Sequence, residues 1–285
     1  MRVVREHDLA RFVDRVGPHL EAHVAENNLI LGLLGDLTRY GRFAGREGEL
    51  GSEAPLLLIV EGARGVESVA MQTPPRALIL TRGSDEATAA LCAFAAKANL
   101  ALPGVVGPEH VAERFAAMWG AQAGCPAVLR MREMVYELAR VTPPASCRGE
   151  LREAEQRDEA ILAAWMVAFV KDAGVDAIPD GRAFVRGKIS ARQLFVWQDG
   201  APVSMVAWGG RTAHGTRIQY VYTPPAERKK GYASAAVAAL SEQLLAQGSS
   251  RCFLFTNAAN PTSNKIYQAL GYEFVCHFRF YDFPA

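Results

Sequence analysis

Apolar residues recur along the chain in two patterns that alternate from one end to the other. Short continuous apolar runs favour strands, and apolar residues spaced three or four apart favour amphipathic helices. The first helical pattern follows Asp8, a residue that can cap a helix, and Gly17-Pro18 is expected to break or restart it. Pro18 then opens a second helix that runs to Leu37, and the Gly-rich, charged segment 41–55 is expected to be a loop.

The rest of the first half continues the alternation. Strands are expected at 56–62, 67–72 and 76–82, a helix from 85 to about 99, a strand at 104–107, a helix at 109–122 and a strand at 127–138.

The second half repeats this order. We expect a strand at 151–154, helices at 158–172 and 179–189, strands at 193–198, 203–208 and 216–222, a helix from about 233 to 247, a strand at 251–256, a helix at 261–270 and a strand at 272–283. Asp199-Gly200 is a strong hairpin signal between two of these strands.

The repeated order predicts an internal duplication with a period of about 145 residues. The Pro-rich segment 142–146 is the expected linker, so the predicted domains are residues 1–143 and 148–285. Each copy is expected to end after its sixth strand. We therefore expect the two halves to pack as a pseudo-dimer and to share or abut strands, which would cover the sheet edge that each copy leaves open.

Composition narrows the class of protein. The 285 residues are 50% hydrophobic and carry a formal net charge of +1, which allows a sizeable core and argues against a nucleic-acid-binding surface. The five cysteines form no C-x-x-C pair and fit reduced thiols in the cytoplasm. With no signal-peptide pattern and no long apolar window, we expect a cytoplasmic protein without membrane contact.

One stretch carries the clearest chemistry. A strand from Thr216 to Tyr222 ends at a Pro-Pro turn, and a basic loop with Gly231 leads into an Ala-rich helix. The first N–H groups of a helix lack intrahelical partners, and the helix dipole adds partial positive charge. The pattern therefore predicts a cradle for a phosphate or pyrophosphate.

This loop resembles the R/Q-x-x-G-x-G/A signature of the GNAT superfamily, the acyl-coenzyme-A-dependent N-acetyltransferases. The matching residues are Arg228, Lys229, Lys230, Gly231, Tyr232 and Ala233. A later segment is similar to the family's fourth-helix pattern, and its matching residues are Asn260, Ser263, Tyr267 and Leu270-Gly271-Tyr272. The resemblance covers about residues 150–283.

The resemblance implies an α/β (α+β) fold with two GNAT-like domains, each a mixed, mostly antiparallel sheet flanked by helices. The first half keeps the order of elements but lacks the signature. At the equivalent loop, Arg82-Gly83-Ser84 is followed by Asp85 and Glu86, two acids where a phosphate would sit. We infer a degenerate first copy that does not bind coenzyme A.

The resemblance also implies roles for individual residues. The basic loop would anchor the pyrophosphate of acetyl-coenzyme A or another acyl-coenzyme A, and the strand around Val221 and Tyr222 would offer free backbone groups to the pantetheine. Tyr267 would protonate the leaving thiolate, and Asn260, with Ser263 in the same pattern, would orient the coenzyme arm. Tyr267 could equally be a core aromatic, and Asn260 could simply cap its helix.

The sequence leaves two parts of the site unassigned, the general base and the acceptor pocket. No general base is evident, because the central strand offers Gln219 and Tyr220 but no Glu. Met205, Trp208 and Tyr220 are candidates for an acceptor pocket, although aromatic residues in strands are more often core.

Metal binding is not expected, since His19 and His23 have zinc-like spacing but no third ligand. We predict direct acyl transfer to a primary amine of a small molecule or peptide, by a monomer or homodimer. The alternative is a coenzyme-A-binding sensor or scaffold without transferase activity.

Overall fold

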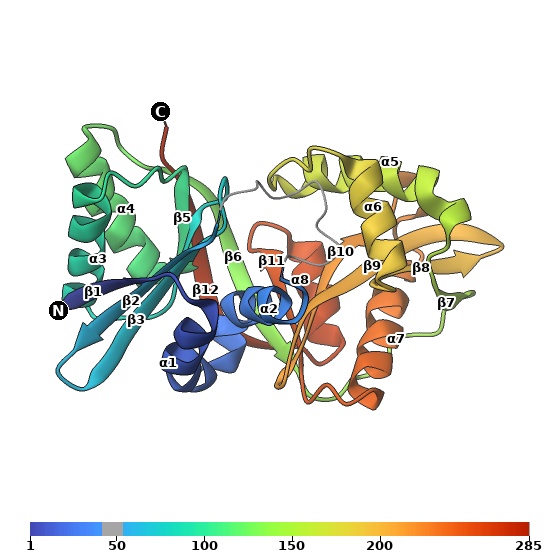
Figure 1. The fold of residues 1–285 in the computed structure, drawn as a ribbon. Helices are drawn as coiled ribbons and strands as arrows, with labels where there is room; N and C mark the ends of the chain where they lie inside the picture. The colour runs from blue at the N-terminus through green and yellow to red at the C-terminus, as the bar shows by residue number, and fades with distance from the viewer. Residues whose placement is uncertain (42–53, 285) are drawn as a thin grey trace.

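The computed structural model describes residues 1–41 and 54–284, which form a twelve-stranded sheet with helices on both faces (Figure 1). The strands of the first half are β1 (Arg2–Glu6), β2 (Leu56–Gly62), β3 (Gly65–Gln72), β4 (Leu78–Leu80), β5 (Gly104–Pro108) and β6 (Val128–Leu138). Its helices are α1 (Leu9–Glu21), α2 (Val24–Tyr40), α3 (Asp85–Lys97) and α4 (Glu109–Ala123).

The second half repeats this order of elements. Its strands are β7 (Glu150–Glu153), β8 (Leu194–Asp199), β9 (Ala201–Thr212), β10 (Gly215–Tyr222), β11 (Cys252–Asn257) and β12 (Glu273–Asp282). Its helices are α5 (Glu159–Ala173), α6 (Gly181–Ser190), α7 (Tyr232–Ala246) and α8 (Pro261–Ala269). The predicted α/β fold, mostly antiparallel with flanking helices, is confirmed.

The two halves exchange their last strands. The strand order is β1-β2-β3-β4-β5-β12-β6-β11-β10-β9-β8-β7, so β12 joins the first half and β6 joins the second. In Figure 1 the red strand β12 lies between β5 and β6. Both new pairings are antiparallel, with Phe280 opposite Val106 and Leu254 opposite Tyr136. This confirms the expectation that the halves share strands and corrects the picture of two separate sheets.

Neighbouring side chains on each strand point to opposite faces of the sheet and show which helices cover each face. On β6, Val135 belongs to a buried cluster with α1 and α2, whereas its neighbour Tyr136 belongs to a cluster with α7 and α8. The second half behaves in the same way, because Val196 packs under α5 and α6 and the adjacent Phe195 packs under α7. One face therefore carries α1, α2, α5 and α6, and the other carries α3, α4, α7 and α8.

The first helix differs from the prediction. The Asp8 carboxylate caps α1 by accepting the backbone N–H of Arg11 at 2.9 Å, as expected. The helix does not break at Gly17-Pro18 but continues to Glu21. Pro18 removes one hydrogen bond, and the helix still gains from burying Val16 and Leu20 in the core on either side of it. The predicted loop 41–55 lies mostly outside the described residues.

Candidate functional site

The strands β10 and β11 separate in the middle of the sheet. They run parallel and pair only through Thr216 with Cys252 and Arg217 with Phe253 in the part of the chain that the structure describes. Beyond Arg217 the two strands diverge, which leaves a wedge between the C-terminal part of β10 and Asn257 at the end of β11. A wedge of this kind offers backbone N–H and C=O groups to a ligand.

A bulge shapes the open side of β10. Gln219 pairs with Ala207 and Tyr222 with Met205, so two residues, Tyr220 and Val221, oppose a single residue of β9. Tyr220 adopts a left-handed backbone conformation with φ of 54°. The carbonyl of Tyr222, predicted to be free, accepts the Ser204 hydroxyl at 3.0 Å.

The loop after β10 leads directly into α7. Gly231 is the N-cap, with φ of 87°, and no side chain caps this helix within the described chain. A side chain at Gly231 would approach only Cys147, whose Cβ lies 3.5 Å from the ideal Cβ position. The first N–H groups of α7 therefore lie at an open helix end, as the cradle prediction requires.

The three loop cations are held in different ways. Arg228 donates to Asp172 on α5 at 2.7 Å and to the carbonyl of Thr223 at 2.9 Å. Lys230 donates to Glu227 at 2.8 Å. Lys229 is exposed, and like Tyr220 it lies in the left-handed region, with φ of 65°. Arg228 is thus an ordered part of the loop.

Tyr232 and Ala233 begin α7 and bring backbone groups to the loop. The Tyr232 side chain is buried, and its hydroxyl donates to the Asp199 carboxylate at 2.7 Å. This hydrogen bond raises the pKa of Tyr232 to about 12. The ring therefore anchors the helix to the β8–β9 hairpin, and only the main chain of Tyr232 is free to serve a ligand.

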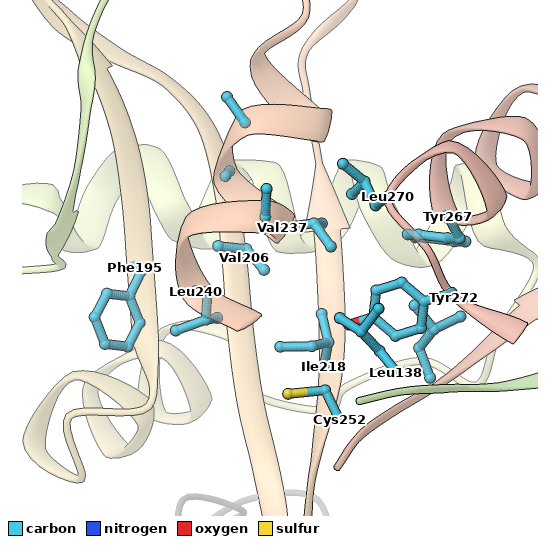
Figure 2. Packing of buried hydrophobic residues seen from close by; sticks show 14 of the residues in the cluster. Leu138, Phe195, Val206, Ile218, Val237, Leu240, Cys252, Tyr267, Leu270 and Tyr272 are labelled. Atoms are coloured by element: carbon cyan, nitrogen blue, oxygen red, sulfur yellow. The ribbon is translucent and has the colours of Figure 1, made fainter. Parts of the chain in front are cut away.

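The predicted residues of α8 are a helix cap and a buried aromatic. The Asn260 side chain caps α8 by accepting the backbone N–H of Ser263 at 3.1 Å. Tyr267 is 7% exposed and packs edge-to-face on Tyr272, with 5.9 Å between ring centroids. Figure 2 shows Tyr267, Leu270 and Tyr272 on one side of the cluster that α7 covers. Burial raises the pKa of Tyr267 to about 12, so the hydroxyl keeps its proton at neutral pH.

The three candidates for the acceptor pocket are not brought together. Met205 is fully buried under α5 and α6, and Tyr220 packs edge-to-face on Phe184 at 5.2 Å on the same side. Trp208 packs against the cluster on the opposite face, and its indole N–H donates to the carbonyl of Arg192 at 3.2 Å.

The equivalent helix of the first half is closed at its N-terminus. Ser84 caps α3 by accepting the N–H of Ala87 at 3.2 Å, and Asp85 pairs with His110 at 2.8 Å. Arg82 pairs with Glu26 at 2.6 Å. The N-terminus of α3 therefore carries an acidic side chain and a side-chain cap, whereas the first N–H groups of α7 have no side-chain cap.

Glu133 on β6 was missed by the sequence reasoning. It lies opposite Asn257 of β11 and Phe278 of β12, on the face covered by α2. Burial raises the pKa of Glu133 to about 7, although the charges of Arg130 and Arg217 lower it. The available signal was the pair of acids Glu133 and Glu137, which alternate with Val135 in an otherwise largely apolar strand.

Metal binding and membrane insertion are two other possible roles of the described residues. No cluster of three His, Cys, Asp or Glu side chains suited to a metal ion occurs within residues 1–41 and 54–284. His19 approaches the hydroxyl of Thr81 at 3.5 Å, and His23 lies 3.1 Å from Arg82. None of the helices in the described ranges is long and apolar enough to cross a membrane.

Comparison with known proteins places the fold. Residues 197–280 match the family described as FR47-like protein. A Drosophila protein of solved structure is similar over 99% of this chain and 98% of its own, with a TM-score of 0.72 and 10% identity. A search of curated proteins gives no match.

Two further solved structures also resemble the whole chain. A GNAT-family acetyltransferase from Colwellia psychrerythraea has a TM-score of 0.56 at 11% identity, with 100% of both chains covered. A tandem GNAT protein from the clavulanic acid biosynthesis pathway has a TM-score of 0.52 at 14% identity, with 100% of this chain and 99% of its own covered. With its repeated order of elements, split central strands and open helix end, this chain has the tandem GNAT fold.

Proposed function

We propose that the protein is an N-acyltransferase that moves the acetyl group of acetyl-coenzyme A, or a related acyl group, to a primary amine of a small molecule or peptide. The observation that carries this proposal is the open N-terminus of α7 at the wedge between β10 and β11. An open helix end favours a pyrophosphate, and a diverging strand pair favours the extended, amide-bearing pantetheine.

The chain's own groups divide the work in this proposal. Backbone N–H groups at the start of α7, with Lys229 and Lys230 beside them, would hold the pyrophosphate. Backbone groups of Val221 in the bulge would hold the pantetheine, and an N–H of β10 would stabilise the oxyanion. The Tyr267 hydroxyl would give its proton to the leaving thiolate.

The two halves would then have different tasks. The second half, residues 148–285, carries the open helix end, whereas Ser84 fills the equivalent position in the first half, residues 1–143. We assign coenzyme A binding to the second half alone. The first half would support it with the strand β6.

Acetyl-coenzyme A depletion measured across a library of primary amines tests the proposal. The library would contain amino acids, polyamines, arylalkylamines and lysine peptides. We expect thioester consumption that depends on an amine, and a fall in kcat with little change in the KM for acetyl-coenzyme A in Tyr267→Phe. A general acid contributes about 100-fold or more.

Tyr272→Phe is the matched control, because it also removes a buried hydroxyl from this cluster. The Tyr272 hydroxyl shares a hydrogen bond with Ser241 at 2.9 Å and has no part in the proposed transfer. Binding of coenzyme A without consumption of the thioester with any amine would favour a sensor or scaffold and refute the transferase.

A further inference from the structure

The attacking amine must lose a proton before it can reach the thioester, and strand exchange brings a carboxylate to that place. We propose that Glu133, on a strand of the first half, is the general base for the reaction in the second half. This inference rests on the transfer activity proposed above.

The register of the sheet places Glu133 one strand away from the wedge, across β11. It lies directly opposite Asn257, the last residue of β11, which borders the gap that β10 leaves. The axes of the paired strands β6 and β11 are about 5 Å apart. Within the first half's own sequence, Glu133 would be remote from β10; the exchange of β6 brings it close.

Glu133 and the proposed acid lie on opposite faces of the sheet. Glu133 lies on the face covered by α2, because it is two residues from Val135 in the α1–α2 cluster. Tyr267 belongs to the cluster under α7 and α8 on the other face. An amine approaching from one face and a thiolate leaving towards the other match the geometry of attack on a thioester carbonyl.

The surroundings keep Glu133 able to exchange a proton near neutral pH. Its strand neighbours Asn257 and Phe278 are uncharged, and burial raises its pKa to about 7 against the opposing charges of Arg130 and Arg217. A base with a pKa near the working pH combines a useful ionised fraction with a useful affinity for protons.

The charged groups on the neighbouring elements are already engaged. Arg217 donates to the backbone and side-chain oxygens of Asn28 on α2, both at 3.2 Å. Arg130 pairs with Asp176 and lies over the ring of Phe280. Helix α2 packs on β6 and also carries Glu26, paired with Arg82, and Asp36 and Arg39 in its C-terminal half.

The substrate nitrogen loses two protons during the transfer. The substrate ammonium gives one proton to the Glu133 carboxylate, and the neutral amine forms a bond to the thioester carbon. As the carbon–sulfur bond breaks, the thiolate takes a proton from Tyr267, and the nitrogen releases its second proton, which restores Tyr267 through solvent. Glu133 then returns its proton to water, so the products are an amide, a thiol and one free proton.

The test is the pH profile of kcat for wild type and Glu133→Gln, using the library amine with the highest rate. In the wild type we expect kcat to rise about tenfold per pH unit below pH 7 and to level off above it, since the carboxylate is the active form. In Glu133→Gln we expect kcat at pH 7 to fall about 100-fold. The rising limb of the pH profile, where kcat increases with pH, should move to higher pH, up to the pKa of the amine.

Two further variants and one binding measurement complete the test. Glu133→Asp keeps a carboxylate, so it should retain the limb near pH 7 with an intermediate kcat. Glu137→Gln, on the same strand and face but paired with Arg251 at 3.5 Å, should behave as wild type. Coenzyme A affinity within threefold of wild type in Glu133→Gln would show that the variant is folded.

Failure of the base proposal can be told apart from failure of the transferase proposal. If Glu133→Gln keeps kcat within threefold of wild type and an unchanged limb, Glu133 is not the base, and the transferase function stands. If Glu133→Gln does not bind coenzyme A, a normal limb in Glu133→Asp supports the base and a missing limb overturns it. If the wild type transfers to no amine, both proposals fall together.

Discussion

At the residue scale, backbone strain borders the proposed reaction centre. Tyr220 in the β10 bulge and Lys229 in the basic loop both lie in the left-handed region, with φ of 54° and 65°. Each such residue costs about 1–2 kcal/mol relative to glycine. Strain of this kind persists where surrounding structure enforces it and often marks functional sites.

Replacing Lys229 with glycine separates stability from binding. In Lys229→Gly we expect the free energy of unfolding to rise by up to about 1 kcal/mol, because glycine adopts positive φ without strain but gains entropy in the unfolded chain. We also expect weaker coenzyme A binding, because an exposed cation beside the proposed pyrophosphate is lost. Chemical denaturation and calorimetric titration measure the two effects.

Asn99→Gly is the control for this prediction. Asn99 also has a positive φ, 49°, but lies in the first half, after α3. Coenzyme A affinity should not change in this variant. An unchanged affinity in Lys229→Gly as well would remove Lys229 from the proposed anion site.

The sequence predicted those site residues whose roles depend on local geometry. Gly231 at the start of α7 and Asn260 at the start of α8 follow from the preferences of helix ends, and the structure has both residues as N-caps. Glu133 could not be predicted in this way, since its place depends on a pairing with residues more than 100 positions away.

At the element scale, α2 ties the halves together by an unusually close packing. A Cβ at Gly32 would lie 2.7 Å from the Cα of Gly210 on β9. Real Cβ atoms do not approach a backbone atom so closely, so this helix can lie on β9 only with glycine at position 32. The contact joins a helix of the first half to a strand of the second.

Two Gly→Ala substitutions in neighbouring helices should have unequal effects. A Cβ at Gly17 in α1 meets nothing within 4 Å apart from its chain neighbours and its own helix backbone, so Gly17→Ala should change the stability by no more than about 1 kcal/mol, because helix propensity opposes the crowding against Pro18. Gly32→Ala should destabilise it by about 1–3 kcal/mol through overpacking. Urea denaturation gives both values, and equal effects of the two substitutions would contradict the close packing of α2.

Periodicity predicted most elements because each is decided by short-range preferences. The hairpin at Asp199-Gly200 formed as expected, with Gly200 at φ of 73°. The helix break at Pro18 was wrong, because burial on both sides of the proline outweighed one lost hydrogen bond. The strand β1 was not assigned, because its sequence Arg-Val-Val-Arg-Glu has neither a continuous apolar run nor a strict alternation.

At the scale of the whole molecule, the exchange of β6 and β12 makes each half depend on the other. Without its partner, the first half would lose β12 from the edge of β5, and the second would lose β6 from the edge of β11. Open strand edges favour association with other chains. The duplication was visible in the sequence. Pairing between the copies could be expected only from a general argument about open strand edges.

Separate expression of the halves tests this dependence. Residues 1–143 and 148–285 should each aggregate or self-associate when expressed alone, and they should form a one-to-one complex when expressed together. Size-exclusion chromatography with light scattering measures both states. Two monodisperse monomers that do not bind each other would contradict the interdependence of the halves.

Coenzyme A binding by Gly231→Glu tests the central claim, an anion cradle at the start of α7, most directly. Gly248→Glu is the matched control, because Gly248 follows the other end of α7 and has a similar φ, 97° against 87° at Gly231. We predict that wild type and Gly248→Glu bind with Kd values within about threefold, and that Gly231→Glu loses about 100-fold, or ~2.7 kcal/mol. Equal affinity in all three proteins would contradict the cradle.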